Sequence, residues 1–212
     1  MTYTQNRRAF LSLSAAALAL GGCSDLVGPP EASPIYMMRP QFPVAPAVKV
    51  PWSLALTRPS APAALDSDRI AILQPGGILD YYARAQYPDP LPALVETALL
   101  DAFTRTNALP GVGRAAEGLR SDYHLYTDIK DFEARYAVAD GIPDVVVTLN
   151  ARLVVSRGRA VAGNTSITRT VRASANSVPA ATQALSEALA GVVGEIVTWA
   201  LAFPQPAVPT TP

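Results

Sequence analysis

Alternating apolar and polar positions predict the strands in the second half of this chain. Every second residue from 145 to 153 is apolar, which is typical of a strand with one buried face. A turn at 156–159, which contains Gly158, then predicts a hairpin with a returning strand at 161–171. The polar partners on the other face of the first strand are Thr148, Asn150 and Arg152.

The same alternation predicts further strands earlier in the chain. Residues 123–129 alternate, and the phase changes at Phe132, which indicates a β-bulge. Residues 70–74 and 78–87 flank the turn Pro75-Gly76-Gly77, so we expect a second hairpin there. Two shorter candidate strands are residues 35–38 and 50–57.

Two segments have the three-to-four residue spacing of amphipathic helices. The first, residues 90–106, carries one apolar stripe formed by Leu91, Leu94, Val95, Ala98, Leu99 and Ala102. The second, residues 179–203, has a heptad row of Val178, Leu185, Val192 and Trp199 with a neighbouring row of Leu189, Ile196 and Phe203. A coiled-coil seam remains an alternative, but three heptads with few charges favour a helix that packs on a sheet.

The order of these elements is strands, helix, strands, helix. Hairpin connections therefore predict an α+β fold in which a largely antiparallel sheet carries both helices packed on one face. The other face of the sheet would then be exposed or covered by a partner. The folded domain is expected at 35–203, followed by a Pro-rich tail at 204–212 that we expect to be disordered.

A lipoprotein signal precedes the predicted domain. The apolar run 10–20 ends in Gly21-Gly22-Cys23, where small residues before the cysteine favour removal of residues 1–22 and attachment of lipid, including an acyl chain such as palmitate, to Cys23. Cys23 is the only cysteine, so no disulfide competes for it. An ordinary secretory signal with a chance cysteine is the alternative. Residues 23–34, with three prolines, read as a lipidated tether.

Residues on either side of the apolar run bear on the route and destination of export. Arg7 and Arg8 precede Phe10 as in a twin-arginine signal, although they also suit the general secretory route. Ser24 stands where an inner-membrane retention signal would place an aspartate, which favours the outer membrane. After the leader we expect no apolar run of transmembrane length, so the lipid would supply the anchor.

Composition and charge narrow the classes of function. Half of the residues are hydrophobic, which allows a sizeable core. Once Arg7 and Arg8 leave with the leader, the 17 acidic residues outnumber the remaining basic ones and the net charge is near −2. Such a chain offers no general basic surface, so we expect no nucleic-acid partner.

Few residues suggest catalysis or a cofactor. His124 is the only histidine and lies in a strand pattern, which makes a His-based triad improbable, and lipidation of Cys23 excludes a cysteine nucleophile. Gly111-Val112-Gly113 lacks the third glycine of a dinucleotide motif. We therefore expect no enzyme activity, no cofactor and no metal site. A cation on Asp128, Asp131 and Glu133 is a weaker alternative to a solvated strand edge.

Several short stretches carry a family resemblance. Besides the lipobox at Cys23 and the final Ala- and Leu-rich helix, they are Ile35-Tyr36-Met37-Met38, Ser53-Leu54-Ala55-Leu56, Arg69-Ile70-Ala71-Ile72-Leu73, Gly77-Ile78-Leu79-Asp80-Tyr81-Tyr82 and Asp131-Phe132-Glu133-Ala134. With them, residues 35–201 resemble the ABC-type transport auxiliary lipoprotein family, which includes the PqiC-type subunits of MCE lipid-transport systems.

The resemblance implies a non-catalytic, periplasm-facing subunit of the cell envelope. Its expected partners are an MCE-domain protein, an ABC permease and an ATPase that move lipids between membranes, with a homo-oligomer as a further possibility. Tyr81, Tyr82 and Tyr87 are candidates for an exposed contact, with core packing as the alternative. The competing hypothesis is a structural or assembly lipoprotein of the envelope that has no transport role.

Overall fold

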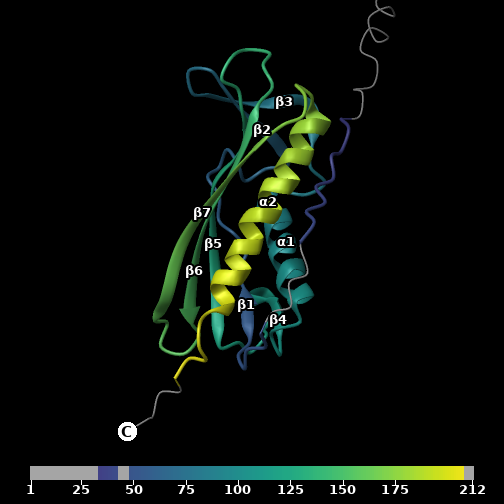
Figure 1. Cartoon of the computed structure of the whole chain (residues 1–212). Helices are drawn as coiled ribbons and strands as arrows, with labels where there is room; N and C mark the ends of the chain where they lie inside the picture. Colours follow the sequence, from purple (N-terminus) through teal and green to yellow (C-terminus); the bar gives the residue numbers. More distant parts are fainter. Residues whose placement is uncertain (1–32, 43–47, 208–212) are drawn as a thin grey trace, which may run out of the picture. The chain divides into compact units, whose positions relative to one another are not determined.

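The computed structural model describes residues 33–42 and 48–207 (Figure 1). The leader, Cys23, most of the tether and the last five residues lie outside this part, so the expectations for them stay predictions. The chain from Pro34 onward forms one unit by its internal contacts.

Strand β5 (Tyr123–Arg135) is the centre of a seven-stranded sheet. On one side it pairs with β6 (Asp144–Val155), and β6 pairs with β7 (Val161–Arg172). On its other side β5 pairs at its start with β1 (Leu54–Leu56) and at its end with β2 (Arg69–Gln74). The sheet is completed by β3 (Ile78–Gln86) beside β2 and β4 (Val112–Arg114) beside β1.

The sheet is mixed, so the prediction of a largely antiparallel sheet was wrong in that respect, whereas the α+β class is confirmed. The two predicted hairpins, β2–β3 and β6–β7, are antiparallel, as is the β5–β6 pair. Strands β1 and β2, however, run parallel to β5, and β4 runs parallel to β1. Parallel neighbours need a long crossover, and the passage through helix α1 supplies it.

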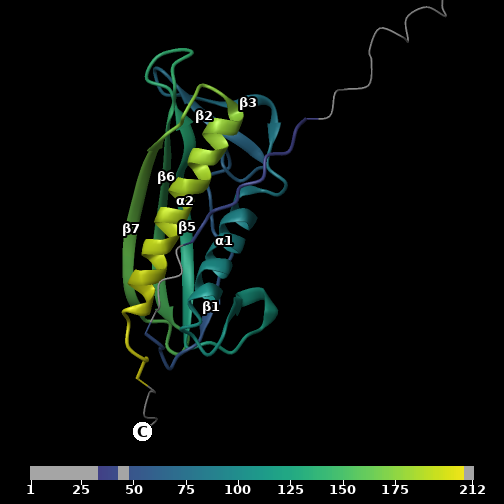
Figure 2. The same ribbon diagram turned by 45° about the vertical axis from the view of Figure 1, so that its right-hand side comes forward.

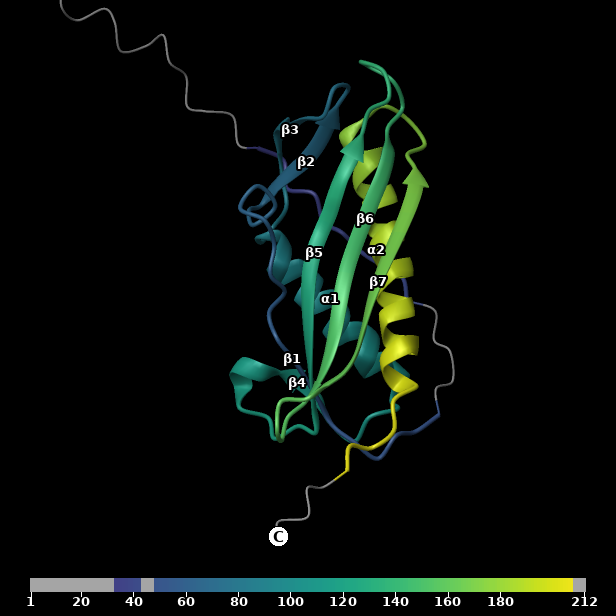
Figure 3. The ribbon, with the colours of Figure 1, turned by 90° about the vertical axis from the view of Figure 1, so that its left-hand side faces the viewer.

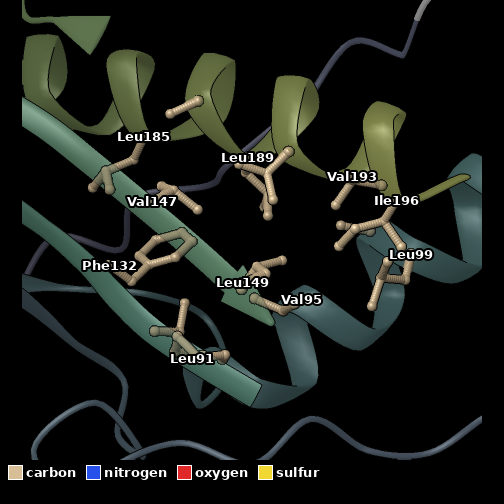
Figure 4. Packing of buried hydrophobic residues seen from close by; sticks show 14 of the residues in the cluster. Leu91, Val95, Leu99, Phe132, Val147, Leu149, Leu185, Leu189, Val193 and Ile196 are labelled. Atoms are coloured by element: carbon tan, nitrogen blue, oxygen red, sulfur yellow. The ribbon is translucent and has the colours of Figure 1, made fainter. Parts of the chain in front are cut away.

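Both helices lie on the same side of the sheet, with the strands in front of them in Figure 3. Helix α1 (Leu91–Thr106) and helix α2 (Val178–Leu201) also contact each other. Figure 4 shows their apolar side chains meeting those of β5 and β6, with Leu189 close to Val147 and Leu149. The predicted inward row of β6 is buried along its whole length, from Val145 to Leu153. Each such side chain contributes about 1.5–3 kcal/mol to folding.

Helix α2 begins where its sequence predicts, but its length and composition correct the expectation that the mature chain has no apolar run of transmembrane length. Ser177 caps its start by accepting a hydrogen bond from the Ala180 N–H, and Pro179 occupies its first turn. At 24 residues it is long and apolar enough to cross a membrane by length and composition, contrary to what we expected of the mature chain. Most of its apolar window is buried against the sheet and α1, as in the core helix of a soluble fold.

Local differences from the predicted strands concern short segments. Residues 35–38 contribute one isolated bridge, between Ile35 and Gln86, and the strand expected at 50–57 is shortened to β1. The bulge lies between Ile129 and Asp131, close to the predicted phase change. Strand β4 was not predicted, because three residues are too few to show a period.

Candidate functional site

The face of the sheet opposite the helices is open and mainly polar (Figure 3). Strand register places the outward residues of β5, β6 and β7 in rows: Tyr126, Arg152 and Asn164; Asp128, Asn150 and Ser166; Asp131, Thr148 and Thr168. The Thr148 and Thr168 hydroxyl oxygens lie 2.9 Å apart and form a hydrogen bond between β6 and β7. The face therefore presents rows of polar side chains from three neighbouring strands.

Acidic residues on this face are paired within the protein. Arg135 lies 2.7 Å from a carboxylate oxygen of Asp131 and 2.7 Å from one of Glu133. Asp128 accepts a hydrogen bond from the hydroxyl of Ser60. Asp128, Asp131 and Glu133, the three residues considered above as a weaker candidate for a cation site, are therefore all engaged by neighbouring side chains. Across residues 33–42 and 48–207, no group of three or more His, Cys, Asp or Glu gathers as a metal site would require.

Glu133 is a carboxyl group on this face whose pKa is shifted by its surroundings. Burial raises the pKa of its carboxyl above the ordinary value, while hydrogen bonds from Arg135 and from the Phe132 N–H oppose the rise. The side chain is 7% exposed. A buried carboxylate that is held by Arg135 acts as a structural tie between neighbouring residues of β5.

The single histidine lies at the start of β5. Its ring is half-buried, 3.4 Å from the Ser121 hydroxyl through Nε2, and its centroid is 6.3 Å from that of Tyr126. Arg152 stacks over Tyr126 at 5.7 Å. His124 lies in a strand, as its sequence pattern predicted, and takes part there in a cluster with Tyr126 and Arg152.

Exposed aliphatic side chains gather at the opposite end of β5. Strand β2 pairs with the end of β5, so the β2–β3 turn and the β5–β6 connection lie side by side, as Figures 1 and 2 show. Strand β3 exposes its first two residues, Ile78 (64%) and Leu79, directly after the first turn, and the second connection exposes Val138 (64%) and Ile142. We call these four residues the apolar tips. Aliphatic side chains exposed together at one end of a sheet are typical of a contact surface.

A hydrogen-bonded chain holds the β5–β6 tip in place. The hydroxyls of Tyr82 and Tyr136 lie 2.8 Å apart, and Tyr136 donates to the Asn176 side chain at 2.9 Å. Asn176 in turn donates to the carbonyl of Asp140 within the tip. Burial is the main cause of the raised pKa of the Tyr82 hydroxyl.

The three tyrosines proposed as contacts divide into two groups. Tyr87 is 1% exposed and packs edge-on against Phe132 at 6.4 Å, so of the two alternatives for it core packing is confirmed. Tyr81 and Tyr82 are half-buried. Tyr81 donates its hydroxyl to the Ala64 carbonyl, and Arg69 covers its ring at 3.6 Å. These tyrosines support the β2–β3 hairpin, whereas the apolar tips, which the strand patterns did not single out, carry the exposed surface.

An apolar groove of about 720 Å³ follows the outer side of α2. Its lining includes three small residues of α2, namely Ala190, Gly191 and Gly194, together with Thr106 of α1. Glu195 borders the groove and forms an ion pair with Arg169 of β7. Among the described residues that line it there is neither His nor Cys, so the groove offers apolar contact rather than a nucleophile.

Comparison with known proteins places this fold in a family. A family model described as ABC-type transport auxiliary lipoprotein component matches residues 36–197. The chain belongs to this family. The auxiliary lipoproteins assist ABC-type transport, and membership indicates an association of the chain with the cell envelope.

Solved structures agree with the assignment to the auxiliary lipoproteins. Protein XCC0632 from Xanthomonas campestris is 30% identical, with a TM-score of 0.73 over 79% of this chain and 95% of that one. The hypothetical protein CT253 from Chlamydia trachomatis is 9% identical, with a TM-score of 0.50 over 73% of this chain and 96% of that one, which shows a shared fold alone. No curated protein matches the chain.

Proposed function

We propose that this protein is a membrane-anchored, periplasm-facing subunit of an MCE-type ABC system that transports lipids between envelope membranes. The family match over residues 36–197 carries the proposal. In this role the protein is not an enzyme. Its task is to bind an MCE-domain protein together with the permease and ATPase, so that lipid passes without exposure to water.

The two exposed surfaces support a docking role. The open face of β5, β6 and β7 presents polar groups among which Asp131 and Glu133 are already paired with Arg135, and the apolar tips present four exposed aliphatic side chains. Burying each tip side chain against a partner would contribute about 1.5–3 kcal/mol. We propose that the tips contact a protein partner of the transport system.

Lipidation of Cys23 would position the domain. Cys23 lies outside the described residues, and its sequence setting supports attachment to a membrane, with the outer membrane favoured by Ser24. Several acyl chains on one residue give stable anchoring, where a single chain is marginal. The short tether between Cys23 and Pro34 would then keep the docking surfaces near the bilayer.

Affinity isolation from native membranes tests the proposal. The lipoprotein is isolated in parallel with a Cys23→Ala form and with a Ser24→Ala form, which keeps the acylated cysteine. We expect the native and Ser24→Ala proteins to recover an MCE-domain protein with its permease and ATPase, and Cys23→Ala to lose them. Recovery of the protein alone, or of cell-wall-associated proteins, would favour the structural lipoprotein instead.

A further inference from the structure

A polar cleft of about 570 Å³ lies at the end of the sheet opposite the apolar tips. The start of β1, the loop before β5 and the β6–β7 turn meet there. The loop and the turn are joined because the Ser156 N–H donates to the Asp122 carbonyl at 2.9 Å. Three walls of the cleft therefore come from separate parts of the sequence, and two of them are fixed to each other.

Two arginines line this cleft, Arg120 and Arg157. Both are exposed, and neither guanidinium has an acidic or hydrogen-bonding partner among the described residues. This contrasts with Arg135, Arg169 and Arg172, which all pair with acids. Guanidinium groups present a planar fork of donors that suits phosphate and carboxylate oxygens.

Serine hydroxyls supply further donors in the same cleft. The Ser121 hydroxyl lies 3.3 Å from that of Ser156 and 3.4 Å from His124 Nε2, both long distances for hydrogen bonds. Hydroxyls held this loosely can turn toward an incoming acceptor. The cleft thus combines two unpaired cations with two neighbouring O–H donors.

Asp122 is the one carboxylate among the described residues of the lining, and it is already engaged. Asp122 Oδ2 accepts from both the N–H and the hydroxyl of Ser53, at 2.8 and 2.9 Å. These bonds turn the carboxylate toward β1. With Asp122 counted, the two arginines still leave the lining with a net positive charge.

The chain after α2 closes one side of the cleft. Tyr123 donates its hydroxyl to the Pro204 carbonyl at 2.8 Å, and Trp52 donates to the Phe203 carbonyl at 3.0 Å. These bonds hold Pro206 and Ala207 as part of the lining. The cleft is therefore formed before a ligand arrives, which lowers the entropic cost of binding.

We infer that this cleft binds a phosphate group through Arg120, Arg157 and the hydroxyls of Ser121 and Ser156. The phosphate belongs either to a phosphodiester headgroup or to a free phosphate, since both present the same tetrahedral oxygens. This inference does not rest on the transport role, because it is argued from charges and donors that the docking proposal does not use.

Titration of the full-length, detergent-solubilised lipoprotein tests the inference. Backbone amide NMR signals are followed while either inorganic phosphate or glycerophosphoglycerol, a soluble phosphodiester, is added. We expect saturable shifts at residues 120–123 and 155–158. The Arg120→Gln/Arg157→Gln double variant should bind about tenfold or more weakly, as expected when charge-assisted hydrogen bonds are lost.

A matched variant separates the site from general charge. Arg58→Gln/Arg105→Gln removes two exposed cations that do not line the cleft, and its affinity should stay within about twofold of the wild type. Ser156→Ala gives a milder probe, with an expected several-fold loss of affinity.

Binding of the diester alone assigns the site to headgroups, and binding of inorganic phosphate alone assigns it to free phosphate. Absence of shifts with both probes, or shifts unchanged in the cleft variant, would overturn the inference.

Discussion

Trp52 joins three parts of the sequence through one side chain. It is fully buried, its ring meets Tyr123 edge-on at 5.1 Å, and its Nε1–H donates to the Phe203 carbonyl. The Tyr123 hydroxyl donates a hydrogen bond to the carbonyl of the next residue, Pro204. Two aromatic side chains thus tie the segment after α2 to the first strands of the sheet.

Replacing Trp52 tests this role. Trp52→Ala should lower the free energy of unfolding by about 3–5 kcal/mol because a large buried ring is lost. Trp52→Phe keeps one aromatic ring but loses the hydrogen bond and the remaining volume of the indole, so it should cost less than Trp52→Ala, about 1–3 kcal/mol. Urea unfolding followed by circular dichroism measures both. Val161→Thr, at a residue that is 56% exposed, is the control and should change stability by about 0.5 kcal/mol or less.

Glu133 predicts a pH dependence of stability. Its pKa is raised by burial in the folded state, so the folded protein binds the proton more tightly than the unfolded chain. The stability that it contributes is therefore fully present below the unfolded pKa and is lost as pH rises through the folded pKa. Relative to Glu133→Gln, the wild type should lose stability as pH rises above the ordinary glutamate range.

Urea unfolding of both proteins between about pH 4 and about pH 7 measures this difference. A difference that does not change with pH, or one that increasingly favours the wild type at higher pH, would show that Arg135 outweighs the burial of Glu133.

Residue by residue, burial was predictable where a period was present. The inward row of β6 and the stripe of α1 were read directly from the spacing of apolar residues. Tyr87 was left between an exposed contact and core packing, because it follows the last residue of β3, where the strand period no longer indicates which way a side chain points. Its partner Phe132 lies far away in the sequence, so no local pattern reports the contact.

At the scale of elements, α2 and β7 approach each other closely at Gly163. A Cβ atom at this position would lie 2.5 Å from Phe203 Cζ and 3.4 Å from Trp199 Cζ2. Further along, the Arg169 side chain crosses α2 beside Gly191 and pairs with Glu195. The absence of a side chain at Gly163 allows the end of α2 to pack on the strand.

Two glycine substitutions test this contact in opposite directions. Gly163→Ala should destabilise the protein by about 1–3 kcal/mol because Phe203 must move. Gly194→Ala, within α2 and with no atom within 4 Å of the added carbon, should stabilise it by about 0.5–1 kcal/mol. Thermal unfolding of the two variants and the wild type shows whether each substitution lowers or raises the stability. Equal stability of both variants would mean that α2 is not seated on β7 at this point.

Elements joined by short turns were predictable, and pairings between distant elements were not. Pro75-Gly76-Gly77 and the turn at Gly158 identify the hairpins, because positive φ angles there favour glycine. The parallel pairing of β1 and β2 with the two ends of β5 depends on how α1 returns the chain across the sheet. Alternation gives the buried face of a strand but not the direction of its neighbour.

For the whole molecule, the two ends of β5 carry different surfaces. One end holds the apolar tips and the other holds the arginine-lined cleft, with the polar face between them. The family and its expected transport role followed from short sequence stretches, and the family is confirmed. The tips and the cleft were not predictable, because each is assembled from loops that become neighbours only in the folded sheet.

Photocross-linking from the tips in intact cells tests most directly whether the protein docks on a transport system. A photoreactive benzoylphenylalanine replaces Val138, and the control places it at Val161, which is also exposed but lies at the other end of the sheet. We expect Val138 to capture an MCE-domain protein or the permease, and Val161 to capture it far less. Capture of neither subunit from Val138, while the protein still accumulates in the envelope, would contradict the proposed docking role.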